Sequence, residues 1–174
     1  DTYTDGAVKS GLSADQQSEI NVGVSADKTA ITYAGYRFTG VTQALVDGTA
    51  AYGGISKAGN STHDNAITIN SDRTNVYGGY TEGTGTTKTD KDNSYKNTVT
   101  ITGGTIGKVY GGYTAAADGT TNQNTVNLGN TDGSKDAPIS IGEIHGGNKT
   151  AAGNTLNVNT AATAGKIENF STVS

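Results

Sequence analysis

The chain has 174 residues and a formal net charge of −4, and only 32% of its residues are hydrophobic. Its 12 Lys and Arg residues are scattered and form no basic stripe, which argues against nucleic-acid binding through phosphate neutralisation. The absence of Cys excludes a disulfide scaffold and Cys-based metal sites, and no run approaches the roughly 18 apolar residues that would span a bilayer.

The first 50 residues show little regularity. Residues 1–17 are polar and weakly patterned, and we expect them to form an N-terminal arm. Residues 18–50 contain short runs in which polar and apolar side chains alternate, which predicts strands at 18–24, 30–33, 36–41 and 43–46. Because these runs do not repeat, we expect residues 18–50 to form an irregular first coil that caps the repeated part of the chain.

Two short phrases alternate from residue 51 onward. The first is Val-Tyr-Gly-Gly-Tyr-Thr, found at residues 76–81 and 109–114, with weaker copies at 51–55 and 144–148. The second begins with Asn and alternates polar and apolar residues, at 65–69, 97–101, 124–128 and 154–158. Alternating phrases are typical of repeat architectures, and the shortest parts sum to about 20 residues, the length of one β-solenoid coil. The prediction is therefore an all-β fold, a parallel β-helix (β-solenoid) of roughly five coils with loop insertions over residues 51–174.

Three polar insertions interrupt the repeats, at residues 81–96, 114–123 and 129–138. The first two leave after the Tyr that comes behind Gly-Gly, so we expect them to emerge on the same side. The third comes after an Asn-phrase strand and leaves from a different corner. Such loops lie in solvent, and insertions on one face are where repeat proteins commonly place binding.

The C-terminal residues 165–174 alternate once more, and this pattern reaches the last residue without a polar cap. A stack of repeats that ends on an apolar layer has to be covered by something. We therefore expect the chain to be a fragment of, or a subunit in, a larger assembly.

Each Asn phrase predicts a strand whose alternate side chains share one face. Val99 and Ile101, with their equivalents in the other copies, are expected to face inward and to stack into apolar ladders. The leading asparagines have two interpretations. They form an internal ladder in which each amide bonds its neighbours along the stack, or each is a turn residue that bonds local backbone. These residues are Asn65, Asn97, Asn124 and Asn154.

The Gly-Gly pairs predict sharp corners that need backbone dihedrals closed to other residues. The side chains that precede them are expected to form an outward row, made of Tyr52, Tyr77, Tyr110 and His145. One interpretation of this row is a stacking platform for sugars. The other, which we favour, is a surface ladder that stabilises the sheet by a fraction of about 1 kcal/mol per pair. Tyr80 and Tyr113 stand at the roots of two loops and are expected to brace them; all six residues are the candidate ligand contacts.

Catalytic and metal-binding patterns are weak. The acidic residues gather in loops, so no pair of carboxylates recurs at strand spacing as glycoside hydrolysis would require. Residues 90–94 imitate the start of a calcium loop, but Tyr95 and Ile101 stand where that loop needs Gly and Glu. His63 and His145 are too few for a metal site. We expect no catalytic residue, no enzymatic activity, no metal and no cofactor.

The phrase Val-Tyr-Gly-Gly-Tyr-Thr at 76–81, followed by Asn-Thr-Val-Thr-Ile-Thr-Gly-Gly-Thr-Ile-Gly-Lys-Val-Tyr-Gly-Gly-Tyr at 97–113, resembles a known type of repeat. It is similar to repeats in the passenger regions of large autotransporter-type surface proteins, or adhesins, of anaerobic Gram-negative bacteria. Lys-Ile-Glu-Asn-Phe at 166–170 is similar to a phrase common in such passengers. The resemblance covers residues 51–174 and implies a right-handed parallel β-helix, export to the cell surface, and an adhesive or spacer role.

The favoured function is a structural or adhesive segment of an exported protein at the bacterial cell surface. Its loop insertions would contact a host or bacterial surface protein or a glycan. The alternative is a self-assembling extracellular filament or matrix subunit, which polymerises with copies of itself through open ends or strand exchange. A polysaccharide-active β-helix enzyme is the least favoured interpretation. Neither a nucleic-acid partner nor membrane insertion by this segment is expected.

Overall fold

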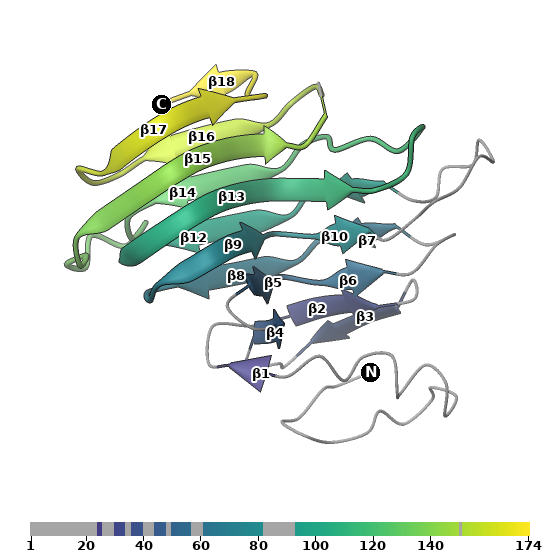
Figure 1. Ribbon diagram of the computed structural model, residues 1–174, viewed down its shortest axis with the longest axis horizontal. Coiled ribbons are helices and arrows are strands. Elements are labelled where there is room, and N and C mark those ends of the chain that lie inside the picture. The colour runs from purple at the N-terminus through teal and green to yellow at the C-terminus, as the bar shows by residue number, and fades with distance from the viewer. Residues whose placement is uncertain are drawn as a thin grey trace.

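The computed structural model describes residues 50–56, 61–81, 93–149 and 151–174, together with the backbone of four short strands between residues 24 and 47. This described part is all-β, contains no helix, and consists mainly of parallel strands in stacked sheets (Figure 1). It confirms the all-β part of the prediction and is compatible with a β-solenoid. The expected arm at 1–17 lies outside the described residues. The described residues also include no helix long and apolar enough to cross a membrane.

The strands before residue 50 pair antiparallel. β2 (Ala30–Tyr33) and β3 (Tyr36–Thr39) form a hairpin, and β1 (Val24–Ser25) lies against β4 (Ala44–Asp47). β4 in turn pairs antiparallel with β5 (Ala50–Tyr52). The strand expected at 18–24 is described only at β1. Parallel pairing in the described part begins at β5, where the repeated phrases begin.

The copies of the Tyr-Gly-Gly phrase and the C-terminal run form the front sheet. β5, β9 (Arg73–Tyr77), β13 (Gly104–Thr114), β15 (Ile139–Gly147) and β17 (Thr163–Glu168) lie side by side and parallel (Figure 1). Equivalent positions of successive copies are paired, so Val76 lies beside Val109 and Val109 beside Ile144. β6 (Ile55–Ser56) and β10 (Tyr80–Thr81) continue the same sheet along the far end of β13.

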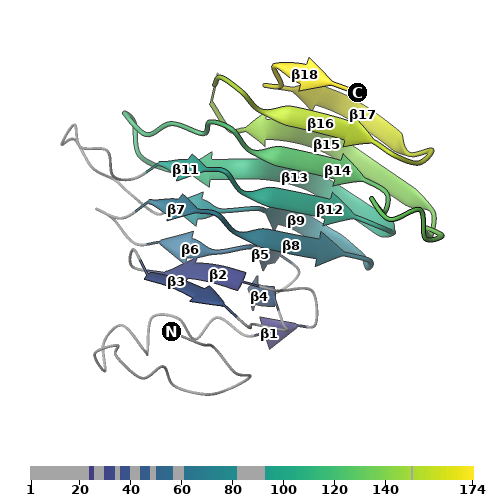
Figure 2. The same cartoon turned by 180° about the vertical axis from the view of Figure 1, so that it is seen from behind.

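The Asn phrases form the back sheet, which Figure 2 shows from the other side. β8 (Ala66–Ile69), β12 (Thr98–Ile101), β14 (Thr125–Leu128), β16 (Thr155–Val158) and β18 (Thr172–Val173) are parallel neighbours. β7 (Thr62–His63) and β11 (Ser94–Tyr95) pair parallel at the side of the molecule, and we call them the side ladder.

The apolar core lies between the front and back sheets. Its back-sheet half is the two predicted ladders, which are confirmed by the register and by burial at Ile67, Val99, Val126 and Leu156 and at Ile69, Ile101 and Leu128. Each fully buried aliphatic side chain of this kind contributes about 1.5–3 kcal/mol. The exception is Val158 at the end of the second ladder, which is 46% exposed.

The Gly-Gly pairs do not need the backbone dihedrals closed to other residues that the sequence led us to expect, although the chain does bend at Gly53 and Gly78, directly after β5 and β9. β13 and β15 run through their pairs as continuous strands, and none of the described glycines in these pairs has a positive φ. A Cβ on Gly111 would lie 2.6 Å from the carbonyl oxygen of Gly146 and 2.8 Å from Cβ of Asn124. Gly is therefore required here because a side chain would clash both with the backbone of the neighbouring strand β15 and with the asparagine across a narrow interior.

The left-handed corner lies elsewhere, at the residue before each leading asparagine. Asp64, Lys96 and Gln123 have φ of 54°, 53° and 57°, and Gly153 has φ of 76°. The turn therefore uses positions that are mostly not Gly. For residues with a side chain this conformation costs roughly 1–2 kcal/mol each, so the surrounding structure has to impose it.

Candidate functional site

The four leading asparagines form one hydrogen-bonded ladder through the interior. Nδ2 of Asn65 donates to Oδ1 of Asn97 at 2.9 Å, and the same bond joins Asn97 to Asn124 at 3.1 Å and Asn124 to Asn154 at 3.4 Å. Oδ1 of Asn97, Asn124 and Asn154 also accepts from the backbone N–H of the preceding ladder residue, at 3.3, 3.0 and 2.8 Å respectively. All four side chains are at most 2% exposed.

A second column of small hydroxyl residues lines the interior beside the asparagine ladder. Thr62, Ser94 and Thr121 are fully buried, and each stands three residues before a ladder asparagine. Ser94 Oγ accepts from Nδ2 of Asn97 at 3.2 Å and donates to the carbonyl of Gly79 at 3.0 Å. Sequence reasoning missed this column, although its constant spacing before each asparagine is a usable signal. Together the two columns make this side of the interior polar and fully hydrogen-bonded, which favours one register of stacking.

The outer face of the front sheet carries the predicted aromatic row. Ring centroids of Tyr52 and Tyr77 are 5.1 Å apart, those of Tyr77 and Tyr110 are 5.4 Å apart, and those of Tyr110 and His145 are 4.8 Å apart. The interplanar angles are 11°, 6° and 12°, so the rings lie nearly parallel. The three tyrosines are half-buried, whereas His145 is only 6% exposed.

Tyr80 and Tyr113 form a second, shorter row next to the first. Their own centroids are 4.8 Å apart and stacked, and both rings meet Tyr77 edge to face at 5.1 and 5.4 Å. Five tyrosines and His145 thus form one continuous aromatic array. Such pairs contribute about 0.5–1.5 kcal/mol each beyond their buried area.

Ring stacking decides which groups the array presents to solvent. Tyr77 has Tyr52 on one face and Tyr110 on the other, and Tyr110 has Tyr77 and His145. A sugar that stacks on an aromatic residue needs a free ring face. The inner rings of the row offer only edges and phenol hydroxyls, so this geometry favours the stabilising role over the sugar platform.

Burial has a clear electrostatic consequence for the array. It raises the pKa of the Tyr77 phenol, and the four neighbouring tyrosines raise it further. Burial likewise raises the pKa of Tyr110, against a smaller opposing effect of Lys108. Both phenols therefore stay protonated in the folded state at pH values where exposed tyrosines ionise.

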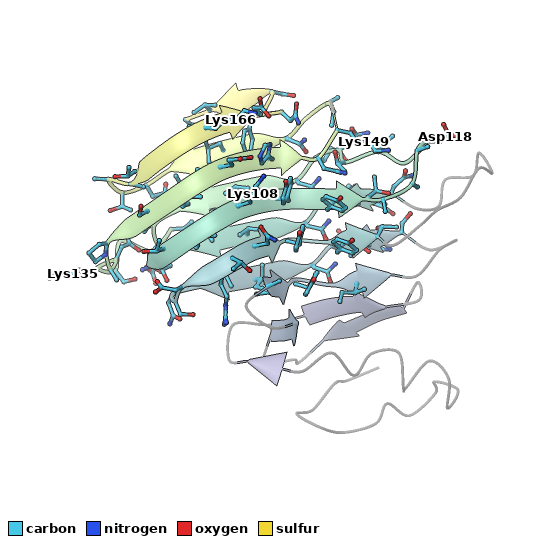
Figure 3. The ribbon with its side chains drawn as sticks, in the orientation of Figure 1. Lys108, Asp118, Lys135, Lys149 and Lys166 are labelled. Carbon is cyan, nitrogen blue, oxygen red and sulfur yellow. The ribbon has the colours of Figure 1, made fainter. Side chains whose placement is uncertain are left out.

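A line of alternating charges runs beside the aromatic row. Lys108, Glu143 and Lys166 occupy paired positions on β13, β15 and β17. Figure 3 shows the two lysines on the front sheet. Lys108 Nζ lies 3.2 Å from Glu143 Oε1, and Lys166 Nζ lies 2.8 Å from Glu168 Oε1. The pKa of Lys166 is raised by its bond to Glu168.

His145 joins this charged line to the aromatic row. Its Nε2 lies 2.9 Å from Glu143 Oε2 and its Nδ1 lies 3.4 Å from Glu168 Oε2. The hydrogen bond from His145, followed by that from Lys108, holds the pKa of Glu143 below its usual range. Within the described ranges no group of three or more His, Cys, Asp or Glu residues could hold a metal ion.

Two of the predicted insertions begin at strand ends that pair with each other. Tyr80 and Thr81 at the end of β10 pair with Tyr113 and Thr114 at the end of β13. The asparagine side chain of Asn148 then bonds both the N–H and the carbonyl of Thr114, at 3.0 and 2.8 Å, as a further strand would. Residues 82–92, which include the first three residues of the candidate calcium loop, lie outside the described residues.

The insertion after β13 is held by Lys149, whose Nζ donates to the carbonyls of Ala116 and Ala117. The insertion between β14 and β15 lies at the opposite side of the molecule, where Figure 3 places Lys135 away from Asp118 and Lys149. There Asp136 Oδ1 accepts from the N–H and the Nδ2 of Asn130, both at 2.8 Å. This loop is thus a turn closed by its own side chains.

Comparison of the chain with protein families, with curated proteins and with solved structures gives no match.

Proposed function

We propose that the chain is a parallel β-solenoid segment of an exported protein, with a structural or adhesive role at the bacterial cell surface. The observation that carries the proposal is the unbroken asparagine ladder, which holds successive repeats in one register over residues 65–154. Such a stack grows by adding repeats, so its length is free to serve as a spacer.

The adhesive role is supported by the position of the insertions. The insertions that come after β10 and β13 begin at paired strand ends, so both begin on one side of the stack. Loops on a rigid scaffold are the usual place for binding residues. In this proposal they contact a surface protein or a glycan, on the host or on another bacterium.

The second candidate is a filament or matrix subunit that assembles with copies of itself. It is favoured by the last strands, where Val158, Ile167 and Val173 are 46%, 49% and 60% exposed. Edge strands with exposed apolar side chains promote pairing with another chain. In such an assembly a second copy covers β17 and β18.

Attachment of protein-coated beads to bacterial and epithelial cells tests the adhesive role. We expect the full chain to attach, and we expect replacement of residues 115–119 by a short Gly-Ser linker to reduce attachment. The matched control is the same replacement at residues 131–135, in the loop on the opposite side. Equal attachment by both variants, or no attachment by the full chain, would contradict the adhesive proposal.

Size measurement by light scattering over a range of concentrations separates the two candidates. Filaments that disappear in Ile167→Lys, but persist in the control Thr163→Lys on the same strand, would favour self-assembly. A monomer at every concentration would exclude it.

A further inference from the structure

The side ladder borders a hollow of about 370 Å³ that lies away from the aromatic array. Its lining residues are Asn93, Tyr95, Thr120, Asn122, Gln123, Ala152 and Gly153. The volume is at the lower end of the range for small-ligand sites. In Figure 2 the side ladder, β7 and β11, lies at one side of the molecule, beyond the ends of the back-sheet strands.

Tyr95 is the aromatic residue of the hollow, and one of its faces is covered. His63 on the neighbouring strand stacks on it with a centroid distance of 4.9 Å and an interplanar angle of 8°. Both residues occupy paired positions on β7 and β11. The ring is therefore held in place before any ligand arrives.

The stack of rings on the side ladder stops at Tyr95, which sets it apart from the longer row on the front sheet. Backbone bonds from Ser94 N to Thr120 O and from Lys96 N to Asn122 O continue the parallel register. They place Asn122 beside Tyr95 where a further ring would be needed to continue the stack. The side of Tyr95 opposite His63 consequently borders amide groups and the hollow.

Two asparagine amides in the hollow are fixed in orientation. Oδ1 of Asn93 accepts from the N–H of Thr120 at 2.9 Å, and Oδ1 of Asn122 accepts from the N–H of Ala152 at 3.1 Å. Among the described residues neither Nδ2 group has a hydrogen-bond partner. Each anchored amide therefore presents N–H donors that have no acceptor within the described ranges.

The described lining of the hollow is uncharged, which suits a neutral ligand. No Asp, Glu, Lys or Arg is among the described residues that line it. Its groups are one aromatic ring, several amides, and the hydroxyls of Thr120 and Tyr95, so it suits a molecule with an apolar face and a rim of hydroxyl groups. We propose that this hollow binds a neutral sugar residue of a glycan, stacked on the face of Tyr95 opposite His63 and hydrogen-bonded by Asn93 and Asn122.

This inference deepens the adhesive role and rests on it only for its biological purpose, because sugar binding by the purified chain is measured without cells. A chain that attaches to cells but binds no sugar would refute the inference alone. A chain that binds sugar in the hollow but attaches to no cell would refute the adhesive role alone.

The test is a titration of the isotope-labelled full chain with methyl glycosides of glucose, galactose and N-acetylglucosamine, followed by backbone amide NMR. A single shallow site predicts a Kd of about 1 mM. We expect shifts confined to the amides of residues 93–96, 120–123 and 152–153. Absence of shifts in these segments with every glycoside would overturn the inference, as would shifts centred on the aromatic array.

Two variants examine the stated contacts. Tyr95→Ala removes the stacking face and is expected to weaken binding about tenfold. Asn122→Asp keeps an oxygen for the N–H of Ala152 but replaces the donor by an acceptor, and is expected to weaken binding up to about tenfold.

Asn75→Asp on the outer face of the front sheet makes the same charge change away from the hollow and should leave affinity unchanged. Because Asn122→Asp is nearly isosteric, it keeps the inference testable if Tyr95→Ala does not fold. Unchanged affinity in Asn122→Asp would refute the proposed contact. A short neutral peptide that shifts the hollow amides when no glycoside does would refute a glycan as the ligand.

Discussion

Replacement of one inner ladder asparagine tests whether the ladder determines stability. Asn124 is the best position, because its Oδ1 accepts from the N–H and the Nδ2 of Asn97, and its own Nδ2 donates to Ser94 and Asn154. Asn124→Ala leaves the buried N–H of Asn97 without an acceptor, at a cost of about 1–3 kcal/mol. The space left by the amide adds about 1 kcal/mol. We expect the free energy of unfolding to fall by about 3 kcal/mol.

The assay is urea denaturation followed by circular dichroism, with the m-value used to check that the same unit unfolds. The matched control is Asn157→Ala, a half-buried asparagine on the outer face of the back sheet whose Nδ2 donates to Asn127 at 2.8 Å. We expect the control to lose less than about 1 kcal/mol. If Asn124→Ala also lowered the free energy of unfolding by less than about 1 kcal/mol, the ladder would not determine stability, and the asparagines would act as independent turn residues.

Asn124→Asp adds a test through pH. The carboxylate can still accept from Asn97, but at neutral pH it places a buried charge beside the carbonyl oxygens of Ser94 and Asn154. Burial would raise the folded-state pKa of this Asp above its unfolded value of about 3.9. The variant should therefore be most stable near pH 4 and lose stability as the pH rises. A variant with equal stability at pH 4 and pH 7 would contradict a buried ladder site.

Three further changes draw on the same geometry. Gly111→Ala should lower the free energy of unfolding by about 2–3 kcal/mol, since its Cβ would lie 2.6 Å from the Gly146 oxygen. The control Gly133→Ala meets no neighbour and should cost only the left-handed strain of about 1 kcal/mol in the same urea assay. Lys96→Gly should raise the free energy of unfolding by about 0.5–1 kcal/mol, and with it the thermal midpoint, because it relieves a φ of 53° at a corner. The folded-state pKa of Tyr77 is raised, so the stability that its protonated phenol contributes is present below about pH 10 and is lost as the pH rises above that value. Tyr77→Phe removes this dependence, so the variant should keep its stability at high pH where the original chain loses it. Alkaline titration of the phenolate absorbance alongside circular dichroism measures this shift.

The all-β class and the positions of the repeated strands could be predicted because two independent signals agree there. Thr98–Ile101 alternates with period two and also recurs at a regular place between Gly-Gly pairs. Alternation indicates a strand with one buried face, and recurrence indicates which strands are neighbours. The register of Val99 with Ile67 and Val126 agrees with an alignment of the phrases.

The role of the Gly-Gly pairs could not be predicted, because glycine is required for two different physical reasons. A left-handed turn needs it for φ, and a close approach of backbones needs it for space. Only the structure shows that Gly111 and Gly146 serve the second need. Of the left-handed corner residues, Asp64 and Gly153 belong to types that adopt positive φ readily, but Lys96 and Gln123 do not, so the four positions share no local signal in the sequence.

The candidate site beside Tyr95 is beyond sequence reasoning for a related reason. In the sequence Tyr95 stands out only as a residue that breaks a calcium-loop pattern. Its neighbours in the hollow, Asn122 and Ala152, come from later parts of the chain and share no phrase with it. Their meeting depends on the register of the side ladder, which is set by backbone bonds between short and irregular segments.

In a stack of repeats such as this one, we expect a ligand to bind where a column of identical side-chain contacts ends. Within the asparagine ladder and the aromatic row, each inner residue uses its neighbours to satisfy the groups that would otherwise bind a partner, as Tyr77 does between Tyr52 and Tyr110. At Tyr95 the column changes from aromatic to amide, so a ring face and two anchored amides are left for another molecule. The residues that interrupt the pattern, rather than those that repeat it, are therefore the first to examine for binding.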